Sequence, residues 1–239
     1  MTGEPDPSEG FGLAFMGEYL MFADYYTSTI KPMLEGAQMT VLMFLIVIVI
    51  SVPLGFLLTL MVKSRFKPIA WLTNGFIYVM RGTPLLLQLF IVCFGLPMIP
   101  GIGEYLVLDR FVAACIGFIL NYAAYFAEIF RGGLLAIDKG QYEASKVLGL
   151  NRWQTTTRVI LPQMFRVVLP TVTNESITLI KDTALLYAVS VPELLHFTHT
   201  AVNRDFTIMP YFIALIIYLI MTLLLTALFK WMERRFRYE

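Results

Sequence analysis

The sequence predicts an all-α membrane protein with five transmembrane helices, and three observations carry that prediction. The chain has 239 residues, of which 58% are hydrophobic and 15% are charged, whereas about a quarter of the residues in a soluble domain are charged. The apolar residues fall in long uncharged blocks, as expected where the solvent is lipid. Lysine and arginine gather in some of the connections between blocks, while the net charge of +1 gives no reason to expect a nucleic-acid partner.

The clearest span runs from about Gln38 to Val62 and contains no charged residue. At about 1.5 Å per residue, a helix of roughly 25 residues is longer than the ~30 Å hydrocarbon core of a bilayer. Pro53 and Gly55 are expected to bend this helix.

The N-terminal residues differ from the span that follows. Residues 1–34 contain acidic side chains among aromatic ones and lack an early lysine or arginine, so they do not resemble a cleaved signal peptide. We expect residues 1–34 to form an extracytoplasmic segment whose part from Phe11 to Leu34 lies as an amphipathic segment on the outer surface. Residues 35–239 are expected to form a single transmembrane domain.

The second apolar block, residues 69–99, is too long for one simple span and includes Arg81. Thr83 followed by Pro84 has the form of an N-cap and a proline at the first helical position, which predicts a second span from about Thr83 to Ile99. The residues before it would form an interfacial helix whose arginine reaches the lipid headgroups. The alternative is one long tilted helix with Arg81 buried.

Three further spans are predicted from about Phe111 to Phe130, from about Val168 to Val189 and from about Ile208 to Phe229. Lysine and arginine concentrate in the connection after the first span, in the polar loop 131–166 and in the C-terminal tail. By the positive-inside rule these parts face the cytoplasm. The N-terminus is then outside and the C-terminus cytoplasmic, as an odd number of spans requires.

The polar loop contains a predicted short helix at about residues 141–148. Gly140 and Gly149 stand at its two ends, and glycine tolerates the left-handed conformation that ends helices. Asn151 with a glutamine three residues later predicts a capping box for the next helix. A short rigid helix that projects from a membrane domain can transmit force to a soluble partner, although an ordinary amphipathic connector would give the same local pattern.

Glu143-Ala144-Ser145, followed by Gly149 and later by Leu161-Pro162, resembles the EAA motif of ABC importer permeases, with serine in place of the second alanine. Other segments look like the polar amino acid permease family. They appear in the family's order and spacing, and the resemblance covers the chain from Leu34 onward. These segments are Arg81-Gly82-Thr83-Pro84, the stretch from Tyr125 through Glu128 to Arg131, Leu161-Pro162-Gln163 and Lys181-Asp182-Thr183.

The resemblance implies a type I ABC importer permease: a transmembrane subunit of an ATP-driven importer for a polar amino acid, in the cytoplasmic membrane of a prokaryote. It implies that the loop helix is a coupling helix that docks on an ATPase subunit through Gly140, Gln141, Glu143, Ala144, Ser145 and Gly149. ATP and Mg would be bound by a dimer of that separate ATPase, because this chain has no phosphate-loop motif. A second permease subunit, identical or related, and an extracytoplasmic amino acid-binding protein are the other implied partners.

The fourth predicted span carries one polar stripe. At 100° per residue its polar members fall within an arc of roughly 120°: Asn174, Glu175, Thr178, Lys181 and Asp182. The stripe either joins two subunits or lines a translocation pathway. Ionisable residues inside a membrane are functional candidates, and a Glu175 without an internal partner would favour a basic amino acid. Importers of glutamine, glutamate or cystine are the alternative.

The third predicted span has polar members of its own. Asn121 and Tyr122 are secondary candidates for the pathway. Glu128 is expected to pair with Arg131, three residues later on the same helix face.

Two other classes of protein fit the sequence less well. An intramembrane enzyme needs a nucleophile aligned with a base, and neither His196 nor His199 falls inside a predicted span. An ion-coupled carrier usually shows inverted repeats, and none is evident. The two histidines lack a third donor for a metal site, so we expect them at the surface near the outer entrance and expect no resident metal or cofactor.

Overall fold

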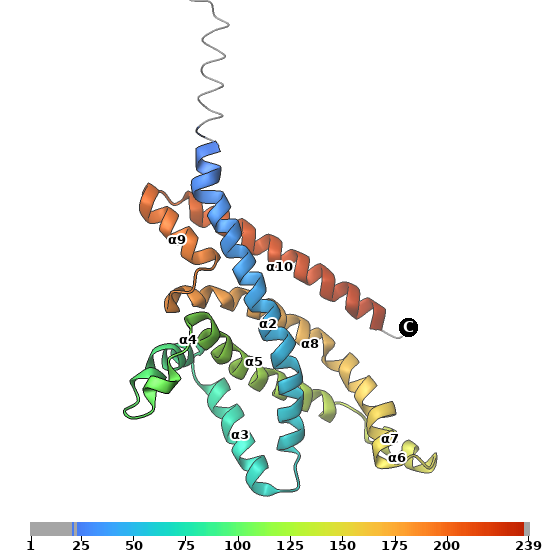
Figure 1. Cartoon of the computed structure of the whole chain (residues 1–239). Helices are drawn as coiled ribbons and strands as arrows, with labels where there is room; N and C mark the ends of the chain where they lie inside the picture. The colour runs from blue at the N-terminus through green and yellow to red at the C-terminus, as the bar shows by residue number, and fades with distance from the viewer. Residues whose placement is uncertain (1–20, 22, 237–239) are drawn as a thin grey trace, which may run out of the picture.

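The computed structural model describes residue 21 and residues 23–236, and in this part of the chain the regular structure is helical (Figure 1). A long helix, α2 (Lys31–Val62), runs through the middle of the molecule and pairs most extensively with α5 (Arg110–Leu135). The helix α8 (Leu161–Asp182) packs against α5, and α10 (Met209–Phe236) packs against α8.

The first predicted span lies inside a longer helix. The helix is continuous from Ala23 to Val62, with a π-helical segment at Tyr26–Ile30 before α2. Residues 23–34, expected as part of a separate amphipathic segment, therefore continue into the helix of the first span. The rest of that predicted segment, residues 11–20 and 22, lies outside the described residues.

The second apolar block is broken, as predicted, but the details differ. The helix α3 (Lys67–Gly82) ends before a bend of 108°, and α4 (Leu85–Phe90) continues through short helical turns to Met98. The alternative of one long helix is therefore wrong. The expected N-cap is also wrong, because Pro84 takes the N-cap position and the Thr83 hydroxyl donates back to the carbonyl of Val79 in α3 at 2.8 Å.

Among residues 23–236, three helices are long and apolar enough to cross a membrane, and a fourth crossing results if α3 and α4 together form one span. The three are Ala23–Val62, Arg110–Leu135 and Met209–Arg235, which contain the first, third and fifth predicted spans. The fourth predicted span coincides with α8 and the 3-10 segment Thr183–Val189 that follows it. Its regular helix begins at Leu161, seven residues before the predicted start, and ends at Asp182 rather than at Val189.

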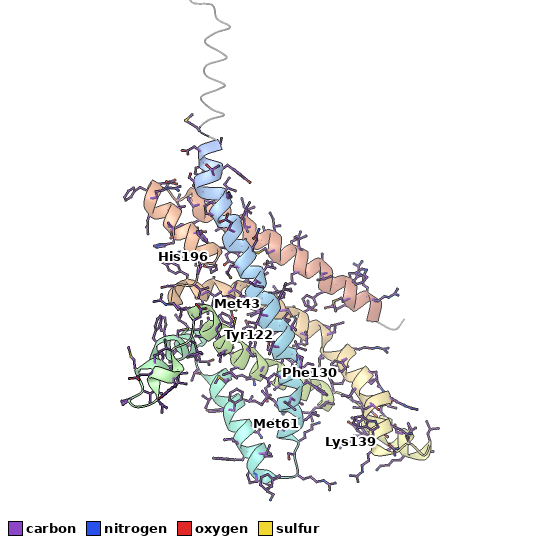
Figure 2. The ribbon with its side chains drawn as sticks, in the orientation of Figure 1. Met43, Met61, Tyr122, Phe130, Lys139 and His196 are labelled. Atoms are coloured by element: carbon purple, nitrogen blue, oxygen red, sulfur yellow. The ribbon has the colours of Figure 1, made fainter. Side chains whose placement is uncertain are left out.

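Small residues allow α2 and α5 to pack closely. The backbone at Gly55 approaches α5 so closely that a Cβ there would lie 2.6 Å from the Cβ of Phe126. One turn further along α2, the hydroxyl of Thr59 donates to the carbonyl of Ala127 at 2.9 Å. Such small-residue contacts are typical of helices that associate in lipid, and a core with Met43 and Phe130 extends from this seam (Figure 2).

The remaining helices lie at the two ends of the bundle. The short helices α6 (Lys139–Val147) and α7 (Arg152–Gln154) connect α5 to α8, and they lie far from α9 (Leu194–Asp205), which stands beside the first part of α2 (Figure 1). Figure 2 marks Lys139 and His196 at these opposite ends. The end that carries α6 is the one predicted to face the cytoplasm.

Candidate functional site

The polar residues of α8 share one face, as the helical spacing predicted. Asn174, Thr178 and Lys181 are exposed, and Glu175 and Asp182 are half-buried. The opposite face is buried against the other helices and includes Ser176, Leu179 and Ile180. The polar stripe therefore points away from the core of the single chain, toward a surface that no described part of the chain covers.

A cavity of about 550 Å³ opens next to this stripe, between the end of α3, the second half of α5 and the first half of α8. Charged and aromatic side chains line it together with two glycines of α5. The lining consists of Arg81, Tyr125, Glu128, Ile129, Gly132, Gly133, Val167, Val168, Thr171 and Glu175. The cavity thus joins Glu175, predicted as a pathway residue, to Arg81 and Glu128 from the family motifs.

An ion-pair cluster forms one wall of the cavity. The predicted pair is confirmed, because the guanidinium of Arg131 donates to both carboxylate oxygens of Glu128, at 2.5 to 3.1 Å. Arg81 lies 3.5 Å from the same carboxylate and 5.4 Å above the ring centre of Tyr125. An ion pair and a cation–π contact hold Arg81 against α5, and its expected contact with the lipid headgroups stays a prediction.

Glu175 differs from these three charges. Within the part of the chain that the structure describes, its carboxylate has no hydrogen-bond or ion-pair partner, although it lines the same cavity as Arg81. A charge inside an apolar bundle is costly when unpaired. This arrangement suits a carboxylate that meets a ligand or a second subunit.

Tyr122 and Asp182, both predicted pathway residues, contact each other directly. The Tyr122 hydroxyl donates to a carboxylate oxygen of Asp182 at 2.7 Å, and its side chain is 2% exposed. The bond joins the middle of α5 to the end of α8. Tyr122 therefore positions Asp182 at the end of the polar stripe, while its own ring belongs to the core.

Asn121 lies in a buried network at the bend between α3 and α4. Its side-chain nitrogen donates to the carbonyl of Met80 and to the side-chain oxygen of Gln88, each at 3.0 Å. Gln88 in turn donates to the carbonyl of Met80 and to the hydroxyl of Thr83. The network satisfies backbone groups that the broken helix leaves unpaired. Gln88 was not among the predicted site residues, although a polar side chain one helical turn after Pro84 in an apolar block was a usable signal.

The predicted loop helix is present as α6, with one end different from the prediction. Gly149 ends it with φ of +73°. At the start, however, Asp138 is the N-cap and its carboxylate accepts from the backbone N–H of Gly140 at 2.6 Å, so Gly140 lies inside the first turn and does not stop the helix. Glu143 consequently falls in the second turn of α6.

The α6 helix is hydrogen-bonded to α8 and exposes one face. Ser145 is 2% exposed, and the side-chain nitrogen of Gln163 donates to the side-chain oxygen of Gln141 at 3.0 Å. Glu143, Ala144 and Leu148 are exposed. The predicted capping box of α7 is confirmed, with Asn151 and Gln154 bonding reciprocally.

At the other end of the molecule a buried carboxylate caps α9. Glu193 is fully buried, accepts from the backbone N–H of His196 at 2.8 Å and accepts from the Tyr218 hydroxyl at 3.0 Å. Burial raises the pKa of Glu193 to about 7.

The two histidines of α9 stand beside an aromatic ring. The ring of His199 lies 5.0 Å from that of Tyr187 and that of His196 lies 6.4 Å from it. Among the described residues no three histidine, cysteine or acidic side chains are grouped closely enough to hold a metal ion.

Apolar spans, a polar helix face beside a charged cavity and a capped helix at one end define a multi-span membrane protein of the transport class. The chain belongs to the family of binding-protein-dependent transport system inner membrane components, whose family model matches residues 51–238. It is 37% identical to the arginine transport system permease protein ArtQ of Bacillus subtilis, over 85% of this chain and 92% of that protein. It is 36% identical to the glutamine transport system permease protein GlnP of Escherichia coli, over 87% of this chain and 94% of that protein.

Solved structures agree with this assignment. The crystal structure of an amino acid ABC transporter with histidines superimposes with a TM-score of 0.80 at 31% identity, over 90% of this chain and 97% of that chain. An inward-facing structure of the MetNI methionine ABC transporter shares the fold, with a TM-score of 0.68 at 20% identity. The protein is thus a multi-pass membrane permease related to those of polar amino acid ABC importers.

Proposed function

We propose that this chain forms the translocation pathway of an ATP-driven importer for a polar amino acid and couples it to a separate ATPase subunit. The observation that carries the proposal is the exposed polar face of α8 beside the cavity that contains Arg81 and Glu175. A single chain leaves this face uncovered. A second permease subunit, identical or related, would close it into a pathway between the two chains.

The charges of the cavity support a pathway better than a simple subunit seal. Glu128 is neutralised by Arg131 and Arg81, so the wall itself is stable. Glu175 lines the cavity with no hydrogen bond or ion pair among the described residues, and the nearby Arg81 attracts its carboxylate without contacting it. A zwitterionic amino acid carries the ammonium group that such an acceptor binds, whereas a purely structural interface would pair the charge within the protein.

Coupling is assigned to α6. The N-cap Asp138 and the left-handed Gly149 make it a short rigid element, and the hydrogen bond from Gln163 to Gln141 ties it to α8, which carries the polar stripe. A push on the exposed residues of α6 would therefore move α8 directly. The partners required are an ATPase dimer, which binds ATP and Mg, and an extracytoplasmic binding protein that delivers the substrate.

The membrane topology proposed is five spans with the N-terminus outside and the C-terminus in the cytoplasm. Beyond the three apolar helices, the α3–α4 pair supplies a fourth crossing. The fifth is α8. Its polar stripe lowers its mean hydropathy, and such a stripe is tolerated in a span because that face meets a subunit or a water-filled pathway instead of lipid.

For the substrate we propose a basic amino acid, on the basis of Glu175. The relatives are described as permeases for arginine, cystine and glutamine, so the alternative is a neutral polar amino acid. Uptake of labelled arginine and glutamine by proteoliposomes that contain the full complex separates the two. Glu175→Gln should lower arginine uptake at least tenfold and leave glutamine uptake, if present, less affected. Unchanged arginine uptake would remove the assignment of Glu175.

A further inference from the structure

We propose that the chain binds the headgroup of an anionic phospholipid at the junction of α6 and α8. The site is a second cavity, of about 550 Å³, which shares Val167 with the cavity next to Glu175 and otherwise has a different lining. Its lining comes from α6, from the π-helical segment Thr155–Ile160 and from the first turns of α8. These residues are Gln141, Arg158, Val159, Pro162, Gln163, Arg166 and Val167.

The polar groups of this cavity are suited to an anion. Two arginines face it, and among its described lining residues none is acidic. Gln163 donates to the side-chain oxygen of Gln141 at 3.0 Å, and the amide nitrogen of Gln141 carries two N–H donors of its own. Guanidinium forks and amide donors match the oxygens of a phosphate group.

The neighbouring surface is suited to an acyl chain. An apolar cavity of about 430 Å³ adjoins the polar one and is lined by Pro162, Phe165, Arg166 and Leu169. Pro162 and Arg166 line both cavities, so the apolar cavity lies directly beside the polar one. The ring of Phe165 packs against the rings of Phe56 and Phe130, with 6.0 Å between ring centres in each pair. These contacts hold the Phe165 side of the apolar cavity in place.

The position in the chain fits the same ligand. Arg158 precedes α8, and its separation of eight residues from Arg166 corresponds to about 12 Å along a helix. Residues of α8 beyond Arg166 enter the proposed span, so the arginines lie where the apolar bundle meets water. Basic cavities between helices at that level bind the phosphate groups of anionic lipids. A free soluble anion has the same phosphate chemistry but would not need the apolar wall.

The role follows from what the cavity connects. It lies between α6, the proposed coupling helix, and α8, and Gln141 belongs to both the cavity and the α6–α8 hydrogen bond. A bound lipid would therefore brace the junction between the two helices. This inference does not require any particular transported substrate.

The test is lipid binding to the purified chain, measured by native mass spectrometry in detergent. Dioleoyl phosphatidylglycerol should bind about tenfold more tightly than dioleoyl phosphatidylcholine. Arg158→Gln should lower the affinity for dioleoyl phosphatidylglycerol about tenfold, as expected for the loss of one charge-assisted contact. Arg158→Lys should retain part of it. Arg152→Gln is the matched control, because it removes an exposed arginine of α7 that does not line the cavity.

Glycerol 3-phosphate, which has the phosphate but no acyl chains, separates the two possible ligands. It should bind at least tenfold more weakly than dioleoyl phosphatidylglycerol. Equal binding of glycerol 3-phosphate would overturn the lipid assignment in favour of a soluble anion. Equal binding of the two lipids, or equal loss of affinity in the Arg158→Gln and Arg152→Gln variants, would overturn the site.

Discussion

The hydroxyl of Tyr122, in the middle of α5, donates a 2.7 Å hydrogen bond to Asp182, the last residue of α8. The ring of Tyr122 is 2% exposed and stacks on Phe118 in the core. This single bond joins the packed interior to the end of the polar stripe. It also ties α5, which carries the ion-pair cluster, to α8, which carries Glu175.

Replacing Tyr122 by phenylalanine should therefore destabilise the protein. The change keeps the ring but leaves a half-buried carboxyl without its donor, which costs about 1–2 kcal/mol of unfolding free energy. Thermal unfolding of the purified chain in detergent measures the effect. Tyr105→Phe is the control, since Tyr105 is 85% exposed; equal midpoints for the two variants would show that the bond contributes nothing.

The buried carboxyl of Glu193 should make stability depend on pH. Its folded pKa of about 7 is above the ordinary value of 4.5, so the folded protein binds more protons between these values. The contribution of the Glu193 carboxyl to the free energy of unfolding is thus most favourable below pH 4.5, and it is lost as the pH rises through 7. The loss amounts to about 3 kcal/mol between pH 4 and pH 8.

Glu193→Gln removes this titration while keeping an oxygen acceptor for Tyr218 and His196. The stability of the wild type relative to this variant should therefore fall as the pH rises from 5 to 8, measured by chemical unfolding at both values. Glu104→Gln, at an exposed position, should show no such trend. A constant difference between the wild type and Glu193→Gln would contradict the prediction.

The close contact at Gly55 should not tolerate a methyl group. A Cβ there would lie 2.6 Å from the Cβ of Phe126 and 2.8 Å from the carbonyl oxygen of Ala123. Gly55→Ala should cost about 1–3 kcal/mol, because one helix must move. Gly75→Ala in α3 meets nothing within 4 Å and should be neutral or stabilising by up to about 1 kcal/mol. Unfolding midpoints of both variants provide the comparison.

Local patterns in the sequence predicted the features that depend on nearby residues. The capping box of Asn151 and Gln154 was confirmed, as was the pairing of Glu128 with Arg131, because each involves groups three residues apart on one helix. The shared face of the polar residues of α8 follows in the same way from helical periodicity. The break at Thr83 was also foreseen, since a proline interrupts the helical hydrogen bonds there.

Contacts between distant parts of the chain could not be predicted in this way. Arg81 pairs with Glu128 and Tyr122 with Asp182, over separations of 47 and 60 residues, and only the packing of the helices brings these groups together. For the same reason Asn121 was expected in the pathway rather than in the network at the bend. The early start of α8 was missed because Gln163 and Arg166 interrupt the apolar residues of its first turns.

The helix that ends at Gly149 allows the most direct test of coupling. Proline fixes φ near −65°, whereas Gly149 has φ of +73°, so Gly149→Pro must distort the end of α6. Gly101→Pro is the matched control, because Gly101 has φ of +83° in a turn outside α6, between the 3-10 segments Leu96–Met98 and Gly103–Leu106, and a Cβ at either glycine would have no neighbour within 4 Å.

The decisive measurement is ATP-driven uptake of labelled arginine, glutamine and cystine by proteoliposomes that contain each variant with its ATPase and binding protein. The Gly149→Pro variant should insert into the membrane normally, but its uptake rate should be at least tenfold lower than that of the wild type. The Gly101→Pro variant should keep most of the wild-type rate. Normal uptake by the Gly149→Pro variant would contradict the proposal that α6 transmits the motion of the ATPase to the membrane helices.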